Sequence, residues 1–189
     1  MLSIITKSIE ESIKVKSKLL DESVYANILK ISDVVTNSFK SGNKVLFCGN
    51  GGSAADAQHL AAEFSGRFYK DRKALPSEAL HCNTSYLTAV ANDYSYEDVY
   101  SRIIDGVGVK GDVLIGISTS GNSKNIVKAF KRANEIGVIT IGLTGKGGGT
   151  MKEHSKYIIE IESNDTPRIQ ESHILVGHII CEIVENNLF

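Results

Sequence analysis

The chain has 189 residues, of which 42% are apolar, a size and composition typical of one domain with a substantial core. Its 21 basic and 22 acidic residues nearly cancel and are scattered, so we expect a small-molecule ligand and neither nucleic acid nor an acidic membrane as partner. Cys48, Cys82 and Cys181 lie far apart without C-x-x-C spacing, which argues against disulfides or a zinc knot and predicts reduced thiols in the core. No continuous apolar run suits a signal peptide or a membrane span, so we predict a cytoplasmic protein.

Residues 1–42 predict a pair of amphipathic helices. Apolar residues recur at intervals of three and four along two stripes, formed by Ile5, Ile9, Ile13 and Leu20 and then by Val24, Ile28, Ile31, Val35 and Phe39. Such a stripe needs a partner, which is either the sheet of the same chain or a second copy of the chain. Both partners stay open at this point, and we favour partial use of the helical pair in a homo-oligomer.

The remainder of the chain alternates between short apolar runs and helical patterns. We predict strands at 45–48, 79–82, 113–117, 138–144 and 157–161, and helices after Ser53, at 85–91, through Val99 and Ile103, at 124–136 and at 168–186. Strands that alternate with helices indicate a parallel sheet covered on both faces. Ligands of such sheets bind beyond the carboxyl ends of the strands.

A glycine-rich loop follows the first predicted strand. Gly49, Gly51 and Gly52 permit a sharp turn and a close approach to a ligand, and Ser53 can cap the next helix, whose N-terminus favours an anion. The alternative is a plain tight turn. A Walker A motif is excluded because no Gly-Lys-Ser/Thr closes the loop. The loose G-x-G-x-x-A pattern allows a dinucleotide, but Asn83 stands where the next strand should end in an acidic residue.

His59 and Glu63 stand four residues apart in the helix predicted after the glycine loop. This spacing puts an imidazole and a carboxylate on one helix face, where they can meet at a common point. A solvated ion pair is the ordinary interpretation of such a spacing. A metal or catalytic site is the alternative, which the neighbouring glycine loop favours.

A second loop, Ser118-Thr119-Ser120-Gly121-Asn122-Ser123, separates a strand from a helix. Its hydroxyl groups can donate several hydrogen bonds to a terminal phosphate without a lysine, which exceeds what one helix cap needs. Asn92 and Asp93 mark a further loop, where Asp93 either caps the next helix or touches a ligand.

Several motifs together resemble the sugar isomerase (SIS) domain and, within it, the sedoheptulose 7-phosphate isomerases, also called phosphoheptose isomerases. They cover nearly the whole chain and comprise Cys-Gly-Asn-Gly-Gly-Ser at 48–53, Asn-Asp at 92–93, Gly-Ile-Ser-Thr-Ser-Gly-Asn-Ser at 116–123, Leu-Thr-Gly-Lys at 143–146 and Arg-Ile-Gln-Glu at 168–171. The resemblance implies a single SIS domain over 1–189, a three-layer α/β sandwich with a five-stranded, flavodoxin-like parallel sheet. It also implies a cytosolic homotetramer with active sites at subunit contacts.

The activity implied by this resemblance is conversion of sedoheptulose 7-phosphate to glycero-manno-heptose 7-phosphate, the first step toward nucleotide-linked heptose for bacterial surface polysaccharide. By motif, the substrate contacts fall on Asn50, Gly51, Gly52, Ser53, Glu63, Asn92, Asp93, Ser118, Thr119, Ser120, Ser123 and Gln170. The catalytic positions fall on Glu63 and His178, and one zinc ion per subunit would be held by His59, Glu63, Gln170 and His178. No nucleotide cofactor is expected. Several relatives carry an acidic residue where this chain has Pro167, so any contact made by that residue is in question.

An aldose–ketose isomerase needs a base for the proton beside the carbonyl and an acid–base group for the hydroxyl proton. We assign these roles to Glu63 and His178, with zinc as a Lewis acid at the carbonyl. Gln170 and His178 would be about 12 Å apart on one continuous helix. Either Gln170 precedes the helix, or the two residues reach one ion from different subunits.

Three rival functions belong to related proteins. A similar SIS protein is an adaptor that binds the bacterial replication initiator, and it lacks Glu and His at the positions that match Glu63 and His178. A sugar-phosphate sensor would carry a DNA-binding domain, and the N-terminal helices show no basic cluster to serve as one. An isomerase of amino-sugar phosphates shares the fold, and only its substrate separates it.

Overall fold

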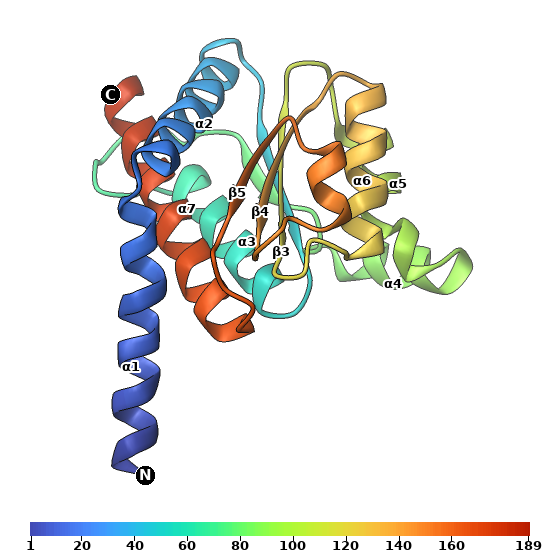
Figure 1. Cartoon of the computed structure of the whole chain (residues 1–189). Helices are drawn as coiled ribbons and strands as arrows, with labels where there is room; N and C mark the ends of the chain where they lie inside the picture. Colours follow the sequence, from blue (N-terminus) through green and yellow to red (C-terminus); the bar gives the residue numbers. More distant parts are fainter.

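Five parallel strands form the central sheet of the computed structural model, which describes residues 1–189 (Figure 1). The strands are β1 (Val45–Gly49), β2 (Ser77–Ala79), β3 (Val113–Ser118), β4 (Ile139–Thr144) and β5 (Tyr157–Glu160). Their spatial order is β2-β1-β3-β4-β5, and every neighbouring pair is parallel. This is the flavodoxin-like order, so the predicted sheet is confirmed.

Helices cover both faces of the sheet and complete the predicted three layers. They are α1 (Leu2–Ser17), α2 (Glu22–Lys40), α3 (Gly52–Ser65), α4 (Thr84–Asp93), α5 (Val99–Val107), α6 (Lys124–Glu135) and α7 (Thr166–Leu188), with short 3-10 helices η1 (Lys18–Leu20), η2 (Tyr96–Asp98) and η3 (Thr150–His154). One core joins the sheet to α2, α3 and α7, and the second joins it to α5 and α6. No helix combines the length and the apolar character needed to cross a bilayer.

The strands that were easiest to predict are those buried on both faces. Every residue of β1 and of β3 is buried, as their unbroken apolar runs require. The predicted strand at 79–82 is wrong in its bounds, because β2 pairs with β1 through Ser77–Ala79 only. Cys82 lies beyond that strand and is exposed, so the expectation of three core thiols holds for Cys48 and Cys181 alone.

The two N-terminal helices are confirmed as helices, but they differ in how their apolar stripes are used. Ile28, Ile31 and Val35 of α2 are buried in the core of the same chain. Helix α1 has no buried residue and projects from the body of the molecule (Figure 1). It contacts the start of α7 through polar groups, such as the Ser12 hydroxyl that donates to Glu171 over 2.7 Å. Therefore only the stripe of α1 still lacks a partner.

Asp112 anchors the edge of the sheet opposite the predicted ligand loops, since it directly precedes β3. Its fully buried carboxylate accepts hydrogen bonds from the amides of Lys44 (3.0 Å) and Val109 (2.9 Å) and pairs with the Lys44 ammonium at 2.6 Å. Burial alone would raise the pKa of Asp112, but the hydrogen bonds from Lys44, Val109 and Asn43 outweigh it and hold the pKa below its ordinary value.

We expect Asp112→Asn to lower the free energy of unfolding by about 1–3 kcal/mol at pH 7. Because the folded-state pKa is the lower one, the carboxylate stabilises the fold above its unfolded pKa of about 3.9, and the contribution disappears as the pH falls through the folded value. Urea unfolding should be measured for wild type and Asp112→Asn from pH 7 down to the onset of acid unfolding. The difference between their free energies of unfolding should become smaller as the pH falls. A difference that stays constant over this range would contradict the assignment.

Candidate active site

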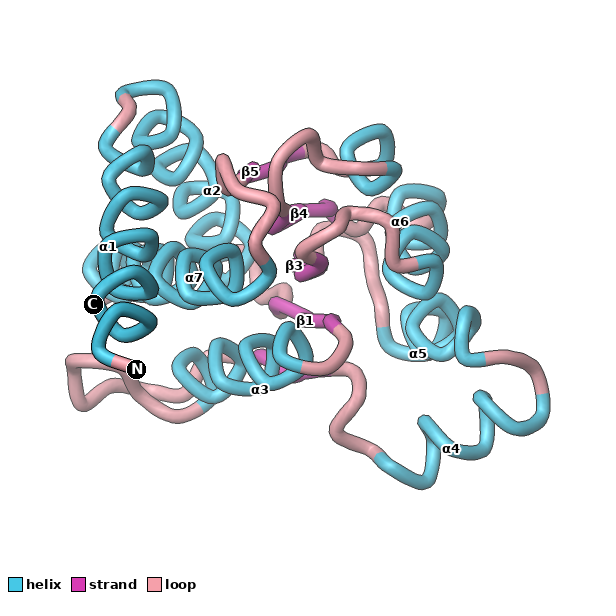
Figure 2. Tube along the Cα trace, turned by 60° about the horizontal axis from the view of Figure 1, so that its bottom comes forward, coloured by secondary structure: helices cyan, strands magenta, loops and turns pink.

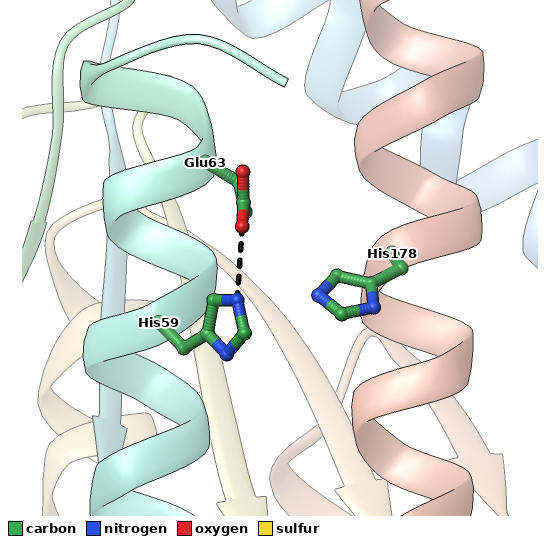
Figure 3. Close-up of side chains that lie close together, drawn as sticks. All are labelled: His59, Glu63 and His178. Carbon is green, nitrogen blue, oxygen red and sulfur yellow. Dashed lines mark hydrogen bonds and ion pairs between the residues drawn. The ribbon is translucent and has the colours of Figure 1, made fainter. Parts of the chain in front are cut away.

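His59, Glu63 and His178 meet between two helices that run side by side, α3 and α7 (Figure 3). His59 Nε2 lies 2.9 Å from Glu63 Oε1, which confirms that the four-residue spacing brings the pair together. The rings of His59 and His178 are 5.0 Å apart in an edge-to-face arrangement. One possible ligand atom from each residue lies within 4.8 Å of the others. We call these three residues the acid–base cluster.

A glycine lets the two helices come close enough to form the acid–base cluster. A Cβ on Gly177, the residue before His178, would lie 2.4 Å from Leu60 Cδ1 of α3. Any larger side chain would therefore require either the buried Leu60 side chain or α7 itself to shift. The exposed fractions of the His59 and Glu63 side chains are 51% and 20%, so a ligand can reach both from solvent.

The surroundings of His178 favour the neutral form of its ring. Burial lowers the pKa of His178, the nearby His59 lowers it further, and only Glu63 acts in the opposite direction. Its Nε2 atom is buried and has no hydrogen-bond partner. A buried ring nitrogen is rarely left unpaired in a native protein, so this atom calls for a ligand.

The glycine loop turns where predicted, but a different residue begins its helix. Gly51, with φ of 56°, is the N-cap of α3, and Ser53 lies within the helix without capping it, so that prediction is wrong. Asn50 is fixed by a reciprocal amide pair with Asn125, with Nδ2···Oδ1 distances of 3.0 and 2.9 Å. The Tyr96 hydroxyl also donates to Asn50 Oδ1. The loop is therefore tied to the start of α6.

Gln170 lies at the glycine loop, away from the acid–base cluster. It belongs to α7 proper, so the alternative in which it precedes the helix is wrong. A Cβ on Gly52 would lie 2.6 Å from Gln170 Nε2, which places the side chain over the first residue of α3. His59 is seven residues further on, about 10 Å along the helix axis. Within one chain Gln170 is thus placed for contact with a ligand of the glycine loop.

The loop of Ser118–Ser123, which we call the hydroxyl loop, joins the end of β3 to the start of α6. The hydroxyl groups of Ser118 and Ser123 lie 2.9 Å apart, and Ser123 leaves the first amides of α6 uncapped. Uncapped amides at a helix N-terminus, together with clustered hydroxyls, suit a phosphate. Gly121, with φ of 64°, packs directly against the backbone of Gly148.

Comparison with known proteins identifies the family. Residues 9–145 match the sequence model of the SIS domain. The phosphoheptose isomerase of Clostridium acetobutylicum is 53% identical over 190 residues, which cover 100% of this chain and 97% of that protein. The chain belongs to the phosphoheptose isomerases of the SIS-domain family. Among solved structures, those of the family members from Neisseria gonorrhoeae (TM-score 0.92, 38% identity) and Francisella tularensis (TM-score 0.94, 30% identity) each cover 98% of both chains.

Two substrate residues predicted from the family motifs lie at the end of α4. Asn92 and Asp93 end α4, which Figure 2 shows away from α3 and α7. The Asn92 amide donates to Asp93 Oδ1 over 2.9 Å. The expectation that Asp93 caps the next helix is wrong, because Ser95 caps η2 and Asp98 is the N-cap of α5. Substrate contact by this pair stays a prediction.

Pro167, at a position that the family resemblance expects to be acidic, lies in the first turn of α7. A proline is tolerated there because that amide needs no partner within the helix. Asp165 is the N-cap residue of the same helix, and its side chain makes no capping hydrogen bond. The chain therefore keeps a carboxylate near this position, two residues earlier.

Three residues that contact the predicted site were missed from the sequence. Asn125 and Tyr96 hold Asn50, and the Phe68 ring stacks on His178 with centroids 5.6 Å apart. An asparagine at a helix start and aromatic residues in loops are common, so no local pattern marked them. The adjoining Asn122-Ser123 motif was the one available signal for Asn125.

Proposed function

We propose that the protein interconverts D-sedoheptulose 7-phosphate and D-glycero-D-manno-heptose 7-phosphate through an enediol, and that it does so in the cytoplasm. This reaction is the first step toward nucleotide-linked heptose for surface polysaccharide. The observation that carries this proposal is the acid–base cluster, in which a carboxylate and a neutral imidazole face one point. The adaptor function is disfavoured because both Glu63 and His178 are present. Family membership over the whole chain supports the same activity.

Each residue has a defined task in this reaction. Glu63 removes the proton from the carbon next to the carbonyl and returns it to the neighbouring carbon. Neutral His178 exchanges the hydroxyl proton, and His59 orients the Glu63 carboxylate through their 2.9 Å contact. The hydroxyl loop binds the phosphate, while Asn50 and Gln170 contact the sugar near Gly52.

The activity test compares the turnover of three substrates by the purified protein, followed by NMR. The substrates are sedoheptulose 7-phosphate, an amino-sugar phosphate and a ketohexose phosphate. Sedoheptulose 7-phosphate should be the preferred substrate by kcat/KM. Preference for the amino-sugar phosphate would assign the protein to that related class of isomerases. Absence of turnover by folded, zinc-supplemented protein would favour the adaptor function.

A zinc ion, one per subunit, fits the acid–base cluster. Two imidazoles and a carboxylate are a donor set of catalytic zinc sites, and the unpaired Nε2 of His178 is a ready ligand atom. When bound, zinc would polarise the substrate carbonyl as a Lewis acid. A carboxylate that binds zinc tightly is a weaker base, so Glu63 would either coordinate the ion loosely or exchange the two roles during turnover.

We expect a chelator to remove zinc and to reduce turnover by at least about tenfold, with recovery on zinc addition. Elemental analysis should find zinc in the wild type and much less in His59→Gln. Gln170→Ala is the matched variant, because in one chain this side chain lies over Gly52. It should keep its zinc, and zinc loss would place Gln170 in the ligand set through another subunit. Zinc-free wild type with full activity would contradict the metal site.

A homotetramer with active sites at subunit contacts is supported by the surface of the N-terminal region. Ile9 and Ile13 of α1 are 55% and 63% exposed, and an apolar groove between α2 and α7 is lined by Tyr25, Leu29 and Ile179, among others. In one chain Glu63 lies eleven residues beyond Gly52, about 16 Å along α3. We propose that a second copy covers α1 and the groove, and that the acid–base cluster of one copy acts on substrate held by the loops of another.

Ile9→Asp should dissociate the oligomer and abolish most of the activity, because a charge in an apolar interface is costly. Val107→Asp, at an exposed position of α5, is the matched control and should leave both properties unchanged. Sedimentation velocity and turnover measure the two effects on the same samples. A dissociated Ile9→Asp protein with wild-type activity would contradict the shared site, and a monomeric wild type would contradict the oligomer.

A further inference from the structure

Glu185, near the end of α7, carries a buried carboxylate that is fully hydrogen-bonded. Its side chain is 2% exposed, as is appropriate for a group with several partners. One oxygen accepts hydrogen bonds from Arg72 Nε (2.9 Å) and the Phe68 amide (3.2 Å), and the other accepts from the amides of Tyr69 and Lys70 (both 2.9 Å). The segment 68–72 is thereby wrapped around a single residue of α7.

Arg72 extends this contact to the end of α3. Its side chain is 3% exposed, and its guanidinium donates to the carbonyl of Glu63 over 2.7 Å and to that of Phe64 over 2.8 Å. These carbonyls belong to the last turn of α3, where they lack helical partners. The guanidinium also donates to the carbonyl oxygens of Gly66 and Lys73. The backbone of Glu63 itself is therefore held by Arg72.

The same arrangement also contacts His178, which is the second reacting residue of the acid–base cluster. Glu185 follows His178 by seven residues, two turns along the same face of α7. It binds the amide of Phe68, and the Phe68 ring stacks on His178. Arg72 and Glu185 thus connect the backbone of Glu63 with the ring of His178, and neither side chain reaches the ligand atoms of the cluster.

We propose that Arg72 and Glu185 are positioning residues that fix the separation of Glu63 and His178, an inference that rests on the proposed isomerase function. An ion pair buried this deeply is costly to desolvate and is no strong source of stability. Its bonds instead hold the end of α3, which carries Glu63, and the amide of Phe68, whose ring stacks on His178. Proton transfer is sensitive to displacements of about 1 Å, so the pair acts on turnover.

The test compares Glu185→Gln with Asp112→Asn, which neutralises an equally buried carboxylate next to β3, away from the acid–base cluster. In Glu185→Gln we expect kcat to fall by about 10-fold to 100-fold with KM changed by less than about threefold. The NMR signals of the His178 ring should move in this variant. Asp112→Asn should keep the wild-type kcat and the wild-type His178 signals at a temperature where both variants are folded.

If Glu185→Gln does not fold, Arg72→Lys is measured in its place. This variant keeps the positive charge and loses the bonds to the carbonyls of α3. Unchanged kcat and unchanged His178 signals in the folded variants would overturn the proposal, and so would an equal loss of kcat in Asp112→Asn. If the wild type proves inactive on sugar phosphates, the proposed function fails. The His178 signals still decide the positioning role in that case.

Discussion

Glu63→Gln should lower kcat for the heptose phosphate by about 10²–10⁴-fold, the range that removal of a general base typically costs. Glutamine has the size of glutamate and can still contact His59 through its amide. It cannot accept the proton that leaves the carbon next to the carbonyl. Because we assign substrate binding mainly to the glycine loop and the hydroxyl loop, we expect KM to change by no more than about threefold.

The matched control for this variant is Glu135→Gln. Glu135 is also a helical glutamate with a cationic partner on the same helix, Arg132 at 2.7 Å, and it lies at the end of α6. Steady-state kinetics of both variants, with circular dichroism to verify folding, give the comparison. A Glu63→Gln enzyme that keeps more than a tenth of wild-type kcat would exclude Glu63 as the base.

Gly121→Ala should disable the phosphate site that we propose at the hydroxyl loop. Gly121 has φ of 64°, and a Cβ there would lie 2.0 Å from the carbonyl oxygen of Gly148, far inside contact distance. The backbone of Gly148 cannot rotate away as a side chain would, so the hydroxyl loop itself must move. We expect kcat/KM to fall by about 10²-fold, because the phosphate-binding groups would be misplaced by about 1 Å.

Gly42→Ala provides the control for conformational strain. Gly42 has φ of 80° and no atom within 4 Å of the added Cβ, so the substitution tests the left-handed backbone alone, at about 1–2 kcal/mol. Calorimetry and binding of inorganic phosphate should show that only Gly121→Ala weakens phosphate affinity. Equal phosphate affinity in both variants would show that the hydroxyl loop does not bind the phosphate.

The sheet was predictable because its central strands are buried on both faces. The runs that became β1 and β3 are continuous and apolar, β4 has isoleucine or leucine at every second position, and each run is followed by glycine or hydroxyl residues. The edge strand β2 has three residues, two of them polar, and such a segment has no periodicity to detect. The start of α3 was misplaced because Gly51 turns the backbone with a positive φ, which removes the need for a capping serine.

The predicted site is correct where the contact between two residues follows from their spacing along one helix. His59 and Glu63 share a helix face, so their contact could be foreseen. The approach of His178 could not, because it depends on how α7 packs against α3 at Gly177. Resemblance to the family supplied His178 as a candidate. Glu185 has no sequence signal at all, since its role arises from burial and from backbone amides that only the fold brings together.

The most direct measurement is turnover of sedoheptulose 7-phosphate in deuterated water, followed by NMR for wild type and Glu63→Gln. An enediol formed by Glu63 predicts deuterium at the carbon next to the carbonyl with the wild type and almost none with the variant. Product that forms without deuterium, or equal labelling by the two proteins, would contradict the account.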